Sequence, residues 1–97
     1  MAHLTIRVPG THVAAVRRAL VGAHQRCGDE LAQAAERYRV THRAGDLDRI
    51  EGAAVELRDL RQAIEQLSRR ARTTELTAHP EVIHDALAAC GLEHLAP

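Results

Sequence analysis

The first hydrophobic pattern in the chain is a strict alternation of polar and apolar residues over the segment His-Leu-Thr-Ile-Arg-Val, residues 3–8. Successive side chains of a β-strand point to opposite faces, so this alternation predicts a short, half-exposed strand. Pro9-Gly10 is expected to end it. A lone strand leaves its backbone groups unpaired, so it needs a partner. We expect that partner to be a second copy of the molecule; residues 73–77 of the same chain are a weaker candidate.

Hydrophobic residues then recur at steps of three and four, which is the period of a helix, from about residue 11 to residue 43. The positions are Val13, Val16, Leu20, His24, Cys27, Leu31, Ala34 or Ala35, and Tyr38. A helix of this length spans about 50 Å, and Thr11 can cap its start. An alternative interpretation breaks the helix at Gly28 and begins a new one at Asp29. We expect one continuous helix, because the apolar stripe keeps its phase through Gly28.

A second apolar stripe follows after Ala44-Gly45-Asp46 and predicts a helix over about 46–72. Its positions are Leu47, Ile50, Ala54, Leu57, Leu60, Ile64, Leu67 and Ala71. Gly45 suits the C-terminal cap of the first helix, and Asp46 or Asp48 suits the start of the second. So short a turn makes the two helices antiparallel neighbours. A turn centred on Gly45 would place Tyr38 opposite Gly52.

A short third helix is predicted over residues 80–90. Pro80 suits the first helical position, Glu81 suits the first turn, and Gly91 suits the end. Its apolar side comprises Val82, Ile83, Ala86, Leu87 and Cys90. Leu92 is expected to fold back on Leu87 as in a Schellman cap. Residues 73–78 are expected to form only a link.

These elements predict a single all-α domain covering residues 1–97, built on a long antiparallel helical hairpin with a short N-terminal strand. The composition agrees, because Phe and Trp are absent and Tyr occurs once, whereas Ala, Leu and Arg are abundant. Two helices and a short third cannot bury both broad stripes. We therefore expect a homodimer whose hairpins form a four-helix bundle.

The composition also excludes some functions. The chain has no lysine, which rules out a Walker A loop and a pyridoxal-phosphate Schiff base. Its formal net charge is zero, which argues against a protein that is basic overall and binds polyanions. No apolar run approaches the ~18 residues of a membrane span, so we expect no membrane partner and a cytoplasmic location. Arginine without lysine also favours a high-GC bacterial source.

The positive charges gather at the open end of the predicted hairpin. Antiparallel pairing brings two arginines early in the first helix close to three at the end of the second, beside the N-terminal strand. The candidate residues for binding nucleic acid or another anion are His3, Thr5, Arg7, Arg17, Arg18, Arg69, Arg70 and Arg72. The simpler interpretation is a solvated helix end at which the helix dipole favours arginines.

The N-terminal segment resembles the ribbon of ribbon-helix-helix DNA-binding proteins. In that family a short alternating strand pairs with its dimer mate, and its outward side chains read the major groove. The resemblance covers about seven residues and implies a DNA-reading role for His3, Thr5 and Arg7. The match ends at Gly28-Asp29-Glu30, which departs from the usual start of the second helix, and the first helix is longer than the family's.

The hairpin also resembles the small helical proteins exported by type VII secretion. Those proteins carry Trp-x-Gly at the turn and a Tyr-x-x-x-Asp/Glu signal. This chain has no Trp, and His42 stands four residues after Tyr38.

Two Cys/His pairs at helical spacing raise the question of a metal. His24 and Cys27 are three apart, and Cys90 and His94 are four apart, so a Cys₂His₂ zinc site would form if the third helix docked beside the first. The favoured interpretation is two buried thiols, which behave as small apolar residues. We therefore expect no metal and no cofactor.

No serine, histidine or carboxylate in the chain stands in a recognisable catalytic arrangement, so we expect no enzyme activity and no catalytic residue. The function that the sequence favours is a small non-enzymatic helical dimer that acts as an interaction or assembly module. A DNA-binding regulator and a type VII secretion relative are the alternatives.

Overall fold

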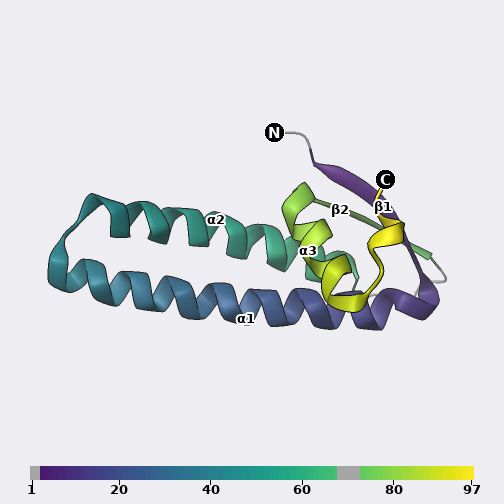
Figure 1. Cartoon of the computed structure of the whole chain (residues 1–97), viewed down its shortest axis with the longest axis horizontal. Helices are drawn as coiled ribbons and strands as arrows, with labels where there is room; N and C mark the ends of the chain where they lie inside the picture. Colours follow the sequence, from purple (N-terminus) through teal and green to yellow (C-terminus); the bar gives the residue numbers. More distant parts are fainter. Residues whose placement is uncertain (1–2, 68–72) are drawn as a thin grey trace.

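The computed structural model of the protein describes residues 3–67 and 73–97. The elements in chain order are β1 (Leu4–Pro9), α1 (Gly10–Thr41), α2 (Ala44–Gln66), β2 (Thr73–Ala78), α3 (Pro80–Cys90) and the short 3₁₀ helix η1 (Glu93–Leu95). The molecule is a rod measuring 49 × 23 × 21 Å. Its length comes from α1 and α2, which lie side by side and antiparallel, while the strands and α3 gather at the end opposite the turn (Figure 1).

The predominance of helix and the third helix are confirmed. Helix α1 runs for 32 residues without a break, and Gly28 lies inside it. A heptad spacing explains how the two long helices meet, because residues seven apart return to nearly the same face of a helix. The buried positions at that spacing are Leu20, Cys27 and Ala34 on α1 and Ala53, Leu60 and Leu67 on the α2 side.

The turn of the hairpin comes earlier than expected. His42, not Gly45, takes the left-handed conformation that ends α1, with φ 53°, and its N–H donates to the carbonyl of Tyr38. Gly45 lies inside the first turn of α2. Histidine adopts this backbone region more readily than most residues, so the expected cap at Gly45 is wrong.

The earlier turn changes which residues of the two helices are neighbours. The thiol of Cys27 donates to the carbonyl of Ala53, and Arg37 pairs with Asp46. In a hairpin centred on Gly45, Cys27 would face residue 63 and Arg37 would face residue 53. The observed partners, Ala53 and Asp46, lie ten and seven residues closer to the turn. The expected placement of Tyr38 opposite Gly52 is therefore wrong.

The second strand corrects the all-α expectation. Residues 73–78 form β2, which pairs antiparallel with β1 in a register running from Leu4 opposite Ala78 to Pro9 opposite Thr73. Leu76 and Ala78 are buried, and Glu75 and Thr77, which alternate with them, are exposed. The backbone pairing of β1 that was expected from a second molecule is thus provided by β2 of the same chain, which has the same alternation as β1.

The main core lies where the sheet and α3 cover the open end of the hairpin. Its most completely buried large residues are Val8, Val16, Leu20, Leu60, Leu67, Leu76, Ile83 and Leu87. His79 caps the start of α3, where its Nδ1 accepts from the N–H of Glu81, and Gly91 caps the end in the left-handed conformation. The N–H of Leu92 donates to the carbonyl of Leu87, as a Schellman cap predicts.

Toward the turn the hairpin has very little core. The fully buried apolar residues described beyond Leu20 and before Leu60 are Cys27, Ala34 and Ala53. Helix α2 ends at Gln66 rather than near residue 72. The rest of the expected helix, with Arg69, Arg70 and Arg72, lies outside the described residues.

Candidate functional site

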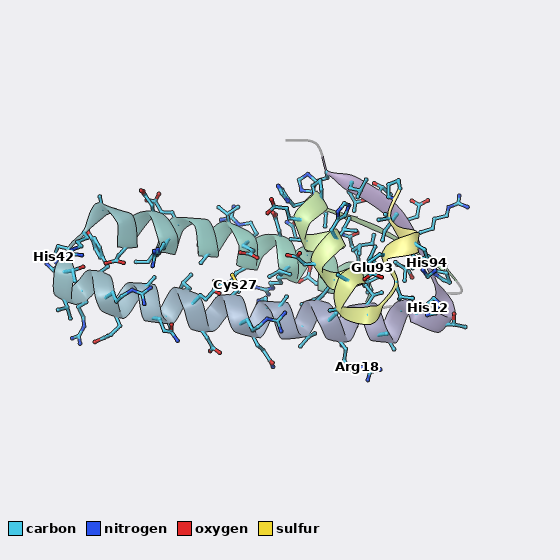
Figure 2. All side chains as sticks on the ribbon, in the orientation of Figure 1. His12, Arg18, Cys27, His42, Glu93 and His94 are labelled. Atoms are coloured by element: carbon cyan, nitrogen blue, oxygen red, sulfur yellow. The ribbon has the colours of Figure 1, made fainter. Side chains whose placement is uncertain are left out.

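The described residues proposed for anion binding lie on two elements, β1 and α1. His3, Thr5 and Arg7 are exposed on β1, and Arg17 and Arg18 are exposed on α1. Figure 2 shows Arg18 on the side of α1 that faces away from the sheet. Arg7 lies 3.9 Å from Glu75 on β2, so a carboxylate accompanies this arginine.

The resemblance to a ribbon-helix-helix protein is weakened by the fold. In that family the strand pairs with its dimer mate, whereas one edge of β1 is already occupied by β2. The unbroken α1 also leaves no turn between two short helices where the family has one.

The two Cys/His pairs stay apart. The thiol of Cys27 donates to the carbonyl of Ala53 within the hairpin, and that of Cys90 donates to the carbonyl of Ala15 near the start of α1. In Figure 2 Cys27 lies midway along the hairpin and His94 at the sheet end. Within residues 3–67 and 73–97 no group of three or more His, Cys, Asp or Glu side chains is arranged to hold a metal ion.

The hollow that the sequence analysis missed lies between α1 and α2 in the half of the hairpin nearer the turn. We call it the hairpin groove; its lining residues are Glu30, Gln33, Ala34, Arg37, Arg49, Ala53 and Glu56. Ala34 and Ala53 are 2% and 8% exposed and form its floor. The spacing of Glu30, Gln33 and Arg37, which places them on one helix face, was the available signal.

Charge in the hairpin groove is divided between its two ends. Glu30 and Glu56 both act electrostatically on Cys27, which places these carboxylates together at the end farther from the turn. Arg37 and Arg49 lie at the other end, where they also line a second hollow beside Arg43 at the turn. Arg37 is 3.5 Å from Asp46, and this contact helps to fix its position.

The cysteine beneath the acidic end is not a nucleophile. Burial, together with the smaller effects of the negative charges of Glu56 and Glu30, raises the pKa of Cys27 from 9.0 to about 11. The thiolate is the reactive form of cysteine, so a thiol held neutral at physiological pH is inert. Cys27 therefore serves as a small core residue of the hairpin.

Three large apolar side chains are exposed in the same half of the hairpin. Val40 is 75% exposed, Val55 is 56% exposed and Leu47 is 37% exposed. Among the described residues, no helix combines the length and the apolar character that crossing a bilayer demands. Comparisons of the chain with models of protein families, with curated proteins and with solved structures found no match.

Proposed function

We propose that the protein is a non-enzymatic homodimeric interaction module, in which two hairpins pack groove to groove and form a four-helix core. The observation that carries this proposal is the charge division of the hairpin groove. Glu30 and Glu56 line one end, Arg37 and Arg49 line the other, and small residues lie between them.

A groove of this kind is complementary to itself. A two-fold axis through the groove near Gln33 places the acidic end of each copy against the basic end of the other. Such an interface uses the same patch on both subunits, which is the commonest symmetry of soluble oligomers. Any other partner would need the opposite order of charges along its own surface.

Packing considerations support the same arrangement. Ala34 and Ala53 let a second pair of helices approach closely, because neither projects beyond the floor of the groove. The buried residues in the half of the hairpin nearer the turn are small: Cys27, Ala34 and Ala53. A second hairpin supplies the apolar burial that a two-helix segment lacks.

Charge reversal and restoration test the proposal. We expect Arg37→Glu with Arg49→Glu to weaken self-association strongly, because four carboxylates would then line each groove. The complementary variant Glu30→Arg with Glu56→Arg should be equally weak alone. An equimolar mixture of the two variants should associate again, as measured by sedimentation equilibrium.

The matched control is Arg39→Glu with Arg58→Glu, which makes the same charge change on residues that do not line the groove. A crosslink provides a direct readout, since Gln33→Cys at the centre of the groove should form an intermolecular disulfide on oxidation, and Gln25→Cys should not. The proposal is overturned if the mixture does not reassociate and Gln33→Cys stays uncrosslinked.

A further inference from the structure

The two outer edges of the sheet differ in their hydrogen-bond partners. The side-chain amide of Gln66 closes the outer edge of β2: its Nε2 donates to the carbonyl of Thr77 at 2.8 Å, and its Oε1 accepts from the N–H of Thr77 at 2.7 Å. Both backbone groups of Thr77 thus point away from β1. An open strand edge is a template for pairing with another chain, and Gln66 interrupts that template at Thr77.

The outward direction of the Thr77 backbone groups shows which backbone groups of β1 point away from β2. In an antiparallel pair, opposite residues alternate between those that exchange hydrogen bonds and those whose N–H and C=O point outward. Thr5 stands opposite Thr77, so its backbone groups also point outward, and the two hydroxyls lie 2.8 Å apart as the close, non-bonded pair allows. The same alternation turns the backbone of Arg7 outward.

The outer edge of β1 has no counterpart to Gln66. Across residues 3–67 and 73–97, no hydrogen bond from outside the β1–β2 pair reaches the backbone N–H or C=O of Thr5 or Arg7. Pro9, which follows in the same outward phase, has no N–H to offer. The open edge therefore presents two donor–acceptor residues, Thr5 and Arg7, separated by the buried Ile6.

We propose that this edge pairs with the β1 edge of a second copy, antiparallel about a two-fold axis at Ile6, to form a four-stranded sheet in the order β2-β1-β1-β2. In this register Thr5 of each chain exchanges backbone hydrogen bonds with Arg7 of the other. Centring the pair on Arg7 would oppose two guanidinium groups, and centring it on Thr5 would oppose Arg7 and His3. The Ile6 register avoids the guanidinium pair and places Arg7 opposite the uncharged Thr5.

A second copy fits this edge, because the two-fold axis at Ile6 places the outward N–H and C=O of Thr5 in each chain opposite those of Arg7 in the other. The outer edge of β2 differs from that of β1, because Gln66 already occupies it at Thr77. Edge pairing through β1 does not rest on the groove-to-groove proposal. The sheet and the turn lie at opposite ends of the rod (Figure 1), so the two surfaces do not compete.

Use of both contacts would build longer assemblies in which sheet-to-sheet and groove-to-groove contacts alternate. Two different two-fold contacts on one chain produce such a series unless its geometry closes on itself. Blocking either contact should leave a dimer, and blocking both should leave a monomer. The two proposals can therefore be tested separately in one set of variants.

The edge variant is Arg7→Pro, which removes an outward N–H and leaves the β1–β2 ladder intact, because proline is tolerated on an outer edge. Its matched control is Arg7→Ala, which loses the same charge and keeps the N–H. We expect Arg7→Pro to weaken the sheet-to-sheet contact about ten- to a hundredfold relative to Arg7→Ala. The measurement is sedimentation equilibrium of the full chain, alone and combined with the Arg37→Glu, Arg49→Glu pair.

The outcomes separate the proposals. Equal association of Arg7→Pro and Arg7→Ala in the background with reversed groove charges overturns edge pairing, whatever the groove variants show. Amide hydrogen exchange is the second readout, which does not require a variant to fold. In the unmodified chain the N–H groups of Thr5 and Arg7 should exchange more slowly at high protein concentration than after dilution; rates independent of concentration contradict the proposal.

Discussion

Gln66 holds Thr77 by both ends of its carboxamide, so one side chain at the end of α2 pairs with β2 as a neighbouring strand would. The two contacts, 2.8 and 2.7 Å long, satisfy the carbonyl and the N–H of the same residue. They also tie the end of the hairpin to the sheet, next to the buried Leu67. A two-stranded sheet is marginal by itself, so these contacts add to the support that it gains from packing on the core.

Replacing Gln66 tests this account. We expect Gln66→Ala to lower the free energy of unfolding by about 1–3 kcal/mol, because two hydrogen bonds are lost. Gln66→Glu should be at least as harmful, since its second carboxylate oxygen faces the carbonyl of Thr77. Urea unfolding provides the measurement, and Gln62→Ala, one turn earlier on the exposed face of α2, provides the control. Equal stability of the Ala variants would refute the role of Gln66.

The turn of the hairpin gives a second prediction, because His42 holds a positive φ. A β-branched residue is strained in that conformation, so His42→Val should destabilise the fold by about 1–2 kcal/mol, whereas His42→Asn should cost less. The ring contact of His42 with Tyr38, with centroids 5.7 Å apart, is lost in both variants and cancels in the comparison. Thermal unfolding measures the difference.

The neighbouring position is the control for His42. Arg43 has φ −78° and ψ 135°, an extended conformation that β-branched residues adopt readily. Arg43→Val should therefore leave stability nearly unchanged. If Val were tolerated equally at both positions, the left-handed conformation of His42 would not be a constraint on the turn.

The sequence predicted those elements whose signal is local. Strict alternation located β1, the unbroken apolar phase predicted α1 through Gly28, and Pro80 and Gly91 bounded α3. Each of these signals depends only on residues within the element. The helical hairpin, which follows from two such helices and a short connection, was predicted for the same reason.

The remaining features depend on contacts between distant residues. Residues 73–78 are as long as β1 but more polar, so their local signal for a strand is weaker. The segment pairs with β1 along one edge and with Gln66 at Thr77 on the other. The turn was misplaced because Gly45 gave a stronger local signal than His42. The hairpin groove was missed because its polarity arises from two helices whose register depended on that turn.

Cys27 gives a prediction about pH. Burial, with a further contribution from Glu56, raises the pKa of the folded-state thiol to about 11, above its ordinary value of 9.0. A raised pKa means that the fold favours the protonated thiol. The contribution of this thiol to the free energy of unfolding is therefore fully present below pH 9 and is lost as the pH rises from about 9 to 11. Stability should fall over this window, because unfolding lets the thiol ionise.

The substitution Cys27→Ala should remove this part of the pH dependence. Comparing urea unfolding at pH 8 and at pH 10.5 for the unmodified chain and for Cys27→Ala isolates the contribution of the thiol, and Cys90→Ala serves as the control. Alkylation offers an independent check, since Cys27 should react slowly with iodoacetamide at pH 8. Fast labelling of Cys27 in the folded protein contradicts the raised pKa.

The last prediction concerns a buried hydroxyl. Oγ1 of Thr74, opposite Val8 in the sheet, is buried and has no hydrogen-bond partner among the described residues. A buried polar group without a partner costs free energy, and valine has the same shape without the hydroxyl. Thr74→Val should therefore raise the free energy of unfolding by about 1 kcal/mol, seen as a higher urea midpoint at an unchanged slope.

The control for this prediction is on the same strand. The hydroxyl of Thr77 lies 2.8 Å from that of Thr5, so Thr77→Val removes a hydrogen bond as well as a polar atom. Thr77→Val should be neutral or slightly destabilising, although valine favours strands as much as threonine does. Equal gains at positions 74 and 77 would point to strand preference as the cause, and no gain at position 74 would mean that water satisfies its hydroxyl.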